Sequence, residues 1–315
     1  MKDTKRKAWI DFAKFIAMLL VTWEHTSQSL SGETFTNILG GGKIAAFHMP
    51  LFFILSGYVI YIYKLQEASL FYTLKQKGLR LFVPAIAWAV LRCIITLHPV
   101  MPWILVSIYW YLTDLFLCYL IIALATKLCR ANIILTALLC MFIVLLIPKM
   151  PAFMMPFLWI GILLRRYEHF LLNTWLFVAS ILCAGYIFTL WDWHYTFYLT
   201  PYNILAPSFE MYSIYIIRFV MGLCCSYIVL FICKKFESSY VVQKLSYMGT
   251  YTLAVYTFSL LLQAIASKCT TIHMTTPILL DTCSLIVACV VYYLSILVHR
   301  LLKKNQYLSL LFLGE

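Results

Sequence analysis

The sequence predicts an all-α membrane protein, a polytopic bundle of about ten transmembrane helices with both termini in the cytoplasm. The chain of 315 residues is 63% hydrophobic and 11% charged, with a mean hydropathy of +0.90, whereas a soluble domain carries about 25% charged residues. It contains ten continuous apolar windows that are long enough to cross a bilayer core of about 30 Å. Its Lys and Arg residues gather on alternate loops. These three observations exclude a water-soluble enzyme.

The ten windows are bounded by charged or turn residues and cover residues 8–30, 44–65, 78–98, 104–126, 131–148, 151–166, 170–191, 211–234, 245–266 and 277–302. The first window follows a short basic stretch, as the apolar core of a secretory signal peptide does. Four ionisable residues nevertheless interrupt it, so we interpret it as a transmembrane helix: Asp11, Lys14, Glu24 and His25. No hydrophilic domain divides the windows, and residues 1–315 are therefore predicted to form one integral-membrane domain.

The basic residues predict the orientation of the chain. With a cytoplasmic N-terminus, most of the 24 Lys and Arg residues lie on the cytoplasmic side, and the opposite side holds only Lys43, Lys149 and Lys268. Basic loops are retained in the cytoplasm, so both termini are predicted there. This topology explains the net charge of +12 without a nucleic-acid partner. The 11 cysteines contain no CxxC pair, so we expect neither a metal site nor a disulfide framework.

Two ionisable residues of the first window share one helical face. Lys14 and His25 are eleven residues apart, about three turns, so their side chains point the same way about 16 Å apart along the axis. Asp11 precedes Lys14 by three residues and is placed to pair with it, whereas Glu24 lies on a neighbouring face and need not touch His25. Simpler interpretations are a lysine that reaches to the cytoplasmic headgroups and a structural histidine. Ionisable groups inside a spanning helix are costly, which favours a functional interpretation of His25.

Five further motifs follow in order along the chain. They are FHMPLFFILSGY in the second window, KQKGLRLFVPAIAW at the start of the third, SIYWYLTDLFLCYLI in the fourth, PFLWIGILLRRY in the sixth and LSYMGTYTLAVYTFS in the ninth. Together with the spacing of Lys14 and His25, these motifs resemble the acyltransferase-3 family of integral-membrane acyltransferases over nearly the whole chain. The chain departs from the family pattern at Lys14, where Arg is commoner, and at Ser259, where many members have His.

The resemblance implies an enzyme of the bacterial inner membrane. Such an enzyme transfers an acyl group, usually acetyl, from acetyl-CoA or another acyl-CoA to a hydroxyl of a surface polysaccharide or a lipid-linked glycan. The reaction needs a base for the hydroxyl proton, donors for the developing oxyanion and cations for the anionic donor. His25 suits the base because imidazole titrates near neutrality. Lys14 and Arg80, both near the cytoplasmic edge, suit the phosphates of coenzyme A, and no metal is expected.

The remaining candidate residues have two interpretations each. His48 begins the second helix and either orients His25 or the acceptor, or is only an interfacial residue. Arg92 and Arg218 need partners within the membrane, for which Asp114 and Glu210 are the most plausible acids; Arg92 and Asp114 then line the acceptor cavity or merely pair. Trp193 belongs to the outer segment WDWHYTFYLTPYN, whose aromatic rings suit sugar stacking and equally suit the aromatic belt of a membrane interface.

Two other functional classes compete with the acyltransferase. A polysaccharide or lipid-linked sugar transporter would account for buried charges, but it predicts internal repeats, which are not evident, and it does not explain the spacing of Lys14 and His25. A catalytically inactive homologue is the second alternative. The expected partners are the glycan or lipid-linked sugar acceptor and the lipid bilayer, and the sequence is compatible with a homo-oligomer.

Overall fold

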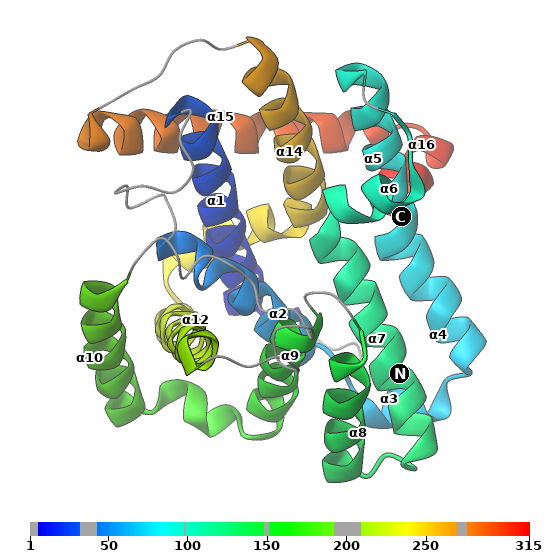
Figure 1. The fold of residues 1–315 in the computed structure, drawn as a ribbon, viewed down its shortest axis with the longest axis vertical. Helices are drawn as coiled ribbons and strands as arrows, with labels where there is room; N and C mark the ends of the chain where they lie inside the picture. The colour runs from blue at the N-terminus through cyan, green and yellow to red at the C-terminus, as the bar shows by residue number, and fades with distance from the viewer. Residues whose placement is uncertain (1–5, 32–42, 98, 148–150, 192–208, 270–275) are drawn as a thin grey trace.

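The computed structural model of the chain is a helical bundle (Figure 1). It describes residues 6–31, 43–97, 99–147, 151–191, 209–269 and 276–315, and these ranges contain helices and no strand. The longer helices are α1 (Ala8–Ser31), α2 (His48–Tyr58), α5 (Val83–Thr96), α7 (Trp110–Leu128), α8 (Ile133–Leu145), α9 (Pro151–Arg166), α10 (Thr174–Leu190), α12 (Phe209–Lys235), α14 (Thr252–Cys269) and α15 (Pro277–Leu302). The shorter ones are α3 (Ile62–Glu67), α4 (Leu70–Lys77), η2 (Gly78–Phe82), α6 (Pro102–Ile108), η3 (Glu168–Leu172), α13 (Tyr240–Leu245), η5 (Ser246–Tyr251) and α16 (Gln306–Leu313).

Each predicted window contains one of the longer helices, which confirms the all-α fold class. Among the described residues, five segments are long and apolar enough to cross a membrane: Leu70–Thr96, Trp110–Leu128, Tyr212–Lys235, Tyr240–Ala266 and Ile278–Leu302. The chain is therefore a multi-pass membrane protein. The total of ten spans and the cytoplasmic position of both termini stay predictions.

Two windows differ from the continuous helices that we expected. The window at 44–65 is broken, since α2 ends at Tyr58 and α3 begins at Ile62. Arg165 donates a hydrogen bond of 2.8 Å to the Tyr58 carbonyl, which supplies a partner to an acceptor that a helix end leaves free. The window at 104–126 is broken at Tyr109, between α6 and α7.

Five of the described helices begin with a side-chain cap, namely α4, α8 and α10, and also α13 and α16, which are capped by Ser239 and Asn305. Ser69 accepts a hydrogen bond from the backbone N–H of Tyr72 at the start of α4, and Asn132 and Asn173 do the same at the starts of α8 and α10. Each cap satisfies at least one of the backbone donors that the first turn of a helix leaves without a partner. Polar residues in these loops therefore define where the apolar helices begin.

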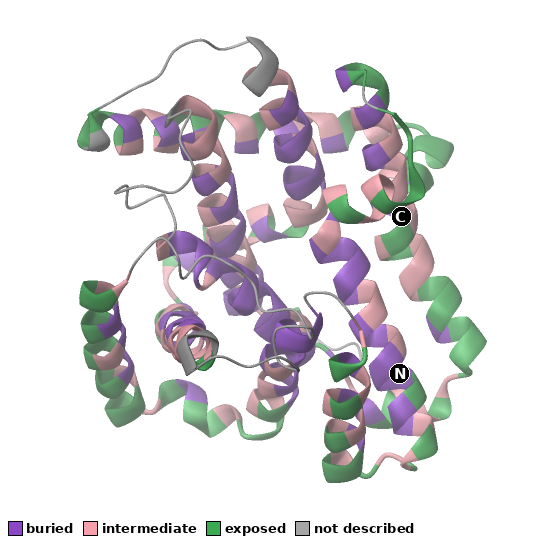
Figure 2. Cartoon of the chain, in the orientation of Figure 1, coloured by how far each residue is buried: buried purple, intermediate pink, exposed green. Residues whose placement is uncertain are grey.

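Helix α1 lies in the centre of the bundle and packs against α2, α12, α14 and α15 (Figure 1). The chain turns most of its buried surface toward this centre, along α1, α2 and α9, whereas α4, α8, α10 and α15 carry exposed faces (Figure 2). The buried core includes Trp9 and Met18 of α1, Phe53 and Leu55 of α2 and Phe157 of α9. The outer faces are apolar as well, as expected for a surface in contact with lipid.

Small motif residues allow close contact between backbones. A Cβ atom at Gly57 would lie 1.9 Å from the carbonyl oxygen of Leu158, and one at Gly161 would lie 2.0 Å from that of Ile54. Any larger residue would force α2 and α9 apart, so the glycines of LSGY and LWIGILL form a tight helix crossing. Gly249 of η5 approaches α1 in the same way, since its Cβ would lie 1.8 Å from the carbonyl oxygen of Asp11.

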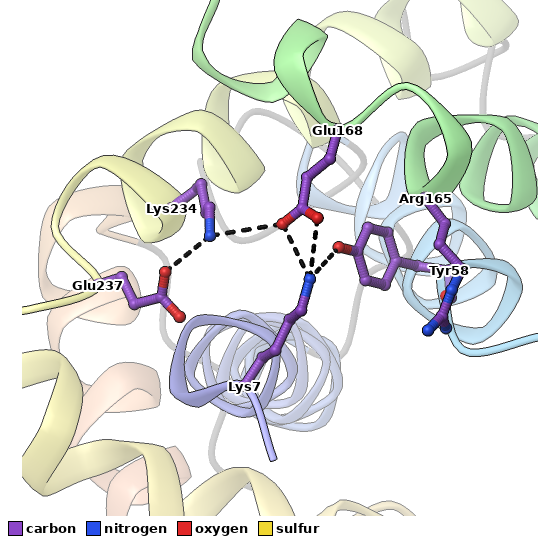
Figure 3. Close-up of polar contacts among 6 residues, drawn as sticks. All are labelled: Lys7, Tyr58, Arg165, Glu168, Lys234 and Glu237. Atoms are coloured by element: carbon purple, nitrogen blue, oxygen red, sulfur yellow. Dashed lines mark hydrogen bonds and ion pairs between the residues drawn. The ribbon is translucent and has the colours of Figure 1, made fainter. Parts of the chain in front are cut away.

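A polar network joins the ends of α2 and α12 to Lys7 and η3 (Figure 3). Lys7 Nζ donates to Tyr58 Oη at 2.8 Å and to both carboxylate oxygens of Glu168 at 2.9 Å. Lys234 Nζ lies 3.4 Å from Glu168 and 2.7 Å from Glu237. Partial burial opposes the charged forms, but the hydrogen bonds and opposite charges outweigh it, so the pKa of Lys7 is raised and that of Glu168 is lowered. This network stabilises the predicted cytoplasmic ends of the central helices.

Candidate active site

Two cavities open along α1. The first has a volume of about 290 Å³ and is lined by three cationic side chains, Lys14, Lys77 and Arg80, among mostly apolar and aromatic ones; we call it the basic cavity. The second has a volume of about 270 Å³, and we call it the histidine cavity because its wall includes Glu24, His25, Gln28, His48 and Trp110.

The two cavities share two wall residues. Met49 of α2 and Tyr256 of α14 line both, so these side chains form the boundary between the cavities. Lys14 faces the basic cavity and His25 the histidine cavity, in agreement with their position on one face of α1 at two depths. A substrate arm that passes between Met49 and Tyr256 would therefore reach from one predicted site residue to the other.

The cations of the basic cavity come from three elements, α1, α4 and η2. Lys14 Nζ lies 3.6 Å from Asp11 Oδ1, which confirms the expected pair, and Arg6 also binds this buried carboxylate. Arg80 belongs to η2, a π-helical stretch in which the helix is widened by an extra residue per turn; such stretches are frequent at functional sites. Lys77 lies about one helical turn before Arg80. The sequence did not identify it as a site residue, because basic residues are common at the cytoplasmic edge of any membrane protein. Lys14 and Arg80 thus share one cavity, and their binding of coenzyme A stays a prediction.

In the histidine cavity, His48 is held by one hydrogen bond and lies beside the carboxylate of Glu24. Its Nδ1 atom lies 2.9 Å from the carbonyl oxygen of Ile44 and 3.2 Å from Glu24 Oε2. A carbonyl oxygen only accepts hydrogen bonds, so Nδ1 carries the hydrogen and Nε2 is left as an acceptor. Glu24 is 3% exposed and His48 is 4% exposed. The positive charge of Arg218 interacts electrostatically with both side chains. The sequence did not reveal the cluster of Glu24, His48 and Arg218, because these residues come from three different helices, α1, α2 and α12.

His25 is accessible from two sides. It lines the histidine cavity and also a smaller cavity of about 90 Å³ between α1, α14 and α15. Among the described residues, its buried Nδ1 atom has no hydrogen-bond partner, so one ring nitrogen is available for proton transfer. Ser259, which stands where the resembled family often has His, lies in the wall of the same small cavity.

Tyr256 is another cavity-wall residue with a buried polar atom that lacks a hydrogen-bond partner among the described residues. Its ring packs edge-on against Tyr109 and Tyr111, with centroids 5.9 and 5.6 Å apart. Its hydroxyl is buried and, within the described ranges, has no acceptor for its hydrogen. A buried donor left without an acceptor costs about 1–3 kcal/mol, so its position at the boundary of two cavities points to a ligand that satisfies it. The sequence placed this residue in a motif but did not identify it as a candidate.

The predicted acceptor residues lie outside these walls. Neither Arg92 nor Asp114 lines the basic or the histidine cavity in the described part of the chain. The charge of Arg92 interacts electrostatically with His25, and the charge of Asp114 interacts electrostatically with Tyr256. Their roles in acceptor binding stay predictions. Trp193 lies outside the described residues, and Glu210 falls where side chains are not described.

The described residues contain no group of three or more His, Cys, Asp or Glu side chains arranged for a metal ion. The walls of the two cavities contain imidazoles for proton transfer, cations and hydrogen-bond donors. These are the groups that acyl transfer to an alcohol requires.

Comparison with protein-family models matches residues 7–297 to Acyl_transf_3, which is described as an acyltransferase domain. The match covers nearly the whole chain, and it includes every wall residue of both cavities except Leu313 and Glu315 of the basic cavity. Comparison with curated proteins and with solved structures gives no significant match.

Proposed function

Since the chain belongs to the acyltransferase-3 family, we propose that it is a membrane acyltransferase that moves an acetyl group from cytoplasmic acetyl-CoA to a hydroxyl of a surface polysaccharide or a lipid-linked glycan. We further propose that it works in a bacterial inner membrane. One observation carries the proposal: a cavity with three cations and a cavity with two histidines meet at Met49 and Tyr256. This arrangement provides an anion site and a proton-transfer site at two depths of one helix.

The donor is proposed to enter through the basic cavity. Lys14, Lys77 and Arg80 line its wall and are suited to the phosphates of coenzyme A. The pantetheine arm then runs between Met49 and Tyr256, so that the thioester reaches the histidine cavity. Lysine at position 14 supplies charge without the planar, two-pronged geometry of arginine, so we expect it to act mainly as a point charge.

Transfer is proposed to occur beside His25. His25 removes the proton from the acceptor hydroxyl, whose oxygen attacks the thioester carbonyl carbon. A C–O bond forms and the C–S bond breaks, and His25 returns the proton to the departing thiolate. The products are the acetylated acceptor and free coenzyme A. His48, held by its hydrogen bond to Ile44 beside Glu24, is a positioning residue whose Nε2 atom orients the acceptor.

Tyr256 is proposed to stabilise the oxyanion. The negative charge of the tetrahedral intermediate develops on the thioester oxygen, which lies at the boundary of the cavities in this pathway. The free hydroxyl hydrogen of Tyr256 at that boundary suits this charge.

The test is acetyl transfer from radiolabelled acetyl-CoA in membranes supplied with glycans from the native host. We expect labelled glycan with the wild type and a rate lower by about 10²–10⁴-fold with His25→Ala, while binding of coenzyme A is retained. His169→Ala is the matched control, because it removes an exposed imidazole outside both cavities. Equal labelling by His25→Ala and the wild type would refute the assigned base. No labelling by any variant, with an active host extract as positive control, would favour the transporter or the inactive homologue.

A further inference from the structure

A third cavity adjoins the basic cavity. It has a volume of about 370 Å³ and lies between η2, η5 and the end of α15; we call it the vestibule. Arg80 and Glu315 line both the vestibule and the basic cavity, so the two cavities adjoin at these residues. The remaining wall consists of Arg6, Thr250, Tyr251, His299, Arg300 and Lys303.

The vestibule carries excess positive charge. Among the described residues of its wall, four are arginine or lysine, Arg6, Arg80, Arg300 and Lys303, and one is acidic, Glu315. Glu315 lies 3.0 Å from Lys303, and Arg6 is bound to Asp11. Within the described part of the chain, neither Arg80 nor Arg300 forms an ion pair. Two guanidinium groups are thus free for a multiply charged anion, which arginine binds through paired hydrogen bonds.

An aromatic surface lies beside these charges. The rings of Tyr251 and His299 are in contact, with centroids 4.8 Å apart and planes at 83°. Both rings belong to the vestibule wall. Aromatic side chains next to cations are suited to a nucleotide, whose base packs on a ring while its phosphate binds the charges.

We propose that the vestibule binds the 3′-phosphorylated adenosine of coenzyme A, while the basic cavity receives the diphosphate and the pantetheine arm. This inference rests on the proposed function. Coenzyme A carries two separate anionic groups, and the chain offers two adjoining cationic cavities that share Arg80. Arg300 and Lys303 bind the 3′-phosphate, which displaces the carboxylate of Glu315 from Lys303. Glu315 therefore weakens donor binding by competing for the same cation.

The inference is tested by direct binding to the detergent-solubilised full-length chain. The probes are coenzyme A and 3′-dephospho-coenzyme A, and the readout is the dissociation constant from calorimetry. We expect the wild type to prefer coenzyme A by about tenfold or more, because a hydrogen-bonded charge pair is lost with the phosphate. Arg300→Ala and Lys303→Ala are expected to lose most of this preference by weakening binding of coenzyme A alone. Glu315→Gln is expected to bind coenzyme A more tightly than the wild type does.

Lys235→Ala is the matched control, since it removes an exposed basic residue at the end of α12 that lines neither cavity. It should keep the full preference for the 3′-phosphate. Equal binding of both probes by the wild type would overturn the inference and leave the proposed acyl transfer intact. A loss of preference in Lys235→Ala equal to that in Arg300→Ala would also overturn it, by showing a general charge effect. Binding of neither probe would count against the inference and the proposed function together.

Discussion

The basic cavity and the histidine cavity are neighbours on one helix but differ in chemistry. The basic cavity contains three cations and adjoins the charged vestibule, whereas the histidine cavity contains two imidazoles, one carboxylate and an amide. In the proposed function, this difference assigns ligand binding and proton transfer to separate positions along α1. The charge of the donor would be neutralised in the basic cavity, and the proton would be transferred in the histidine cavity. Substitutions in the two cavities should therefore affect different kinetic constants.

After His25→Ala, the largest effect is expected for Tyr256, at the boundary between the two cavities. Tyr256→Phe removes only the hydroxyl, and we expect kcat to fall by about 10²–10³-fold with little change in KM for acetyl-CoA, since the hydroxyl is assigned to the transition state. The measurement is steady-state acetyl transfer in membranes. Tyr109→Phe is the control, because that hydroxyl already donates to the Thr257 carbonyl at 3.0 Å. A rise in KM without loss of kcat would place Tyr256 in donor binding instead.

A smaller effect is expected for substitutions of Lys14, and it should appear in KM for acetyl-CoA. Lys14→Ala should raise KM for acetyl-CoA by about tenfold and leave kcat nearly unchanged, because a charge-assisted contact contributes about 1.5–3 kcal/mol. Lys14→Arg should keep the wild-type KM or lower it, since arginine binds phosphate through two hydrogen bonds. The measurement is donor titration at saturating acceptor. A fall in kcat alone would contradict the separation of binding from chemistry.

The smallest effect is expected outside both cavities, in the network of Lys7 and Glu168. The lowered pKa of Glu168 means that its stabilisation is present above the usual value of 4.5 and is lost as pH falls through the folded-state value. The raised pKa of Lys7 means that its share persists at neutral pH and is lost only above the usual value of 10.5. Glu168→Gln should thus lower the thermal midpoint at pH 7, and the difference from the wild type should shrink toward pH 3. Equal midpoints at pH 7 would refute this, and binding of coenzyme A should not change.

The sequence predicted the helices well because long apolar runs in a membrane protein leave few alternatives to a helix. It also predicted the common face of Lys14 and His25 and the pair of Lys14 with Asp11, since both depend only on the geometry of one helix. It missed the contact of Glu24 with His48, which joins two helices. One signal was available: a carboxylate inside a spanning helix is costly and implies a partner.

Contacts between distant segments explain the other omissions. Tyr256 belongs to a recognisable motif, but its unsatisfied hydroxyl becomes evident only when its ring packs against Tyr109 and Tyr111. The vestibule joins Arg6 to Arg300 from opposite ends of the chain, so no local pattern reveals it. The break after α2 depends on Arg165, which belongs to α9.

The boundary at Met49 and Tyr256 also bears on energy conservation in the cell. In the predicted orientation, the two cavities enter the membrane from opposite faces, and a continuous water column between them would dissipate the proton-motive force. A thioether and a phenol ring stand at the one place where both cavities meet. In the proposed pathway, the slender arm of the donor would fill this boundary while it is bound. Such an arrangement would let an acyl group cross the bilayer without opening a path for ions.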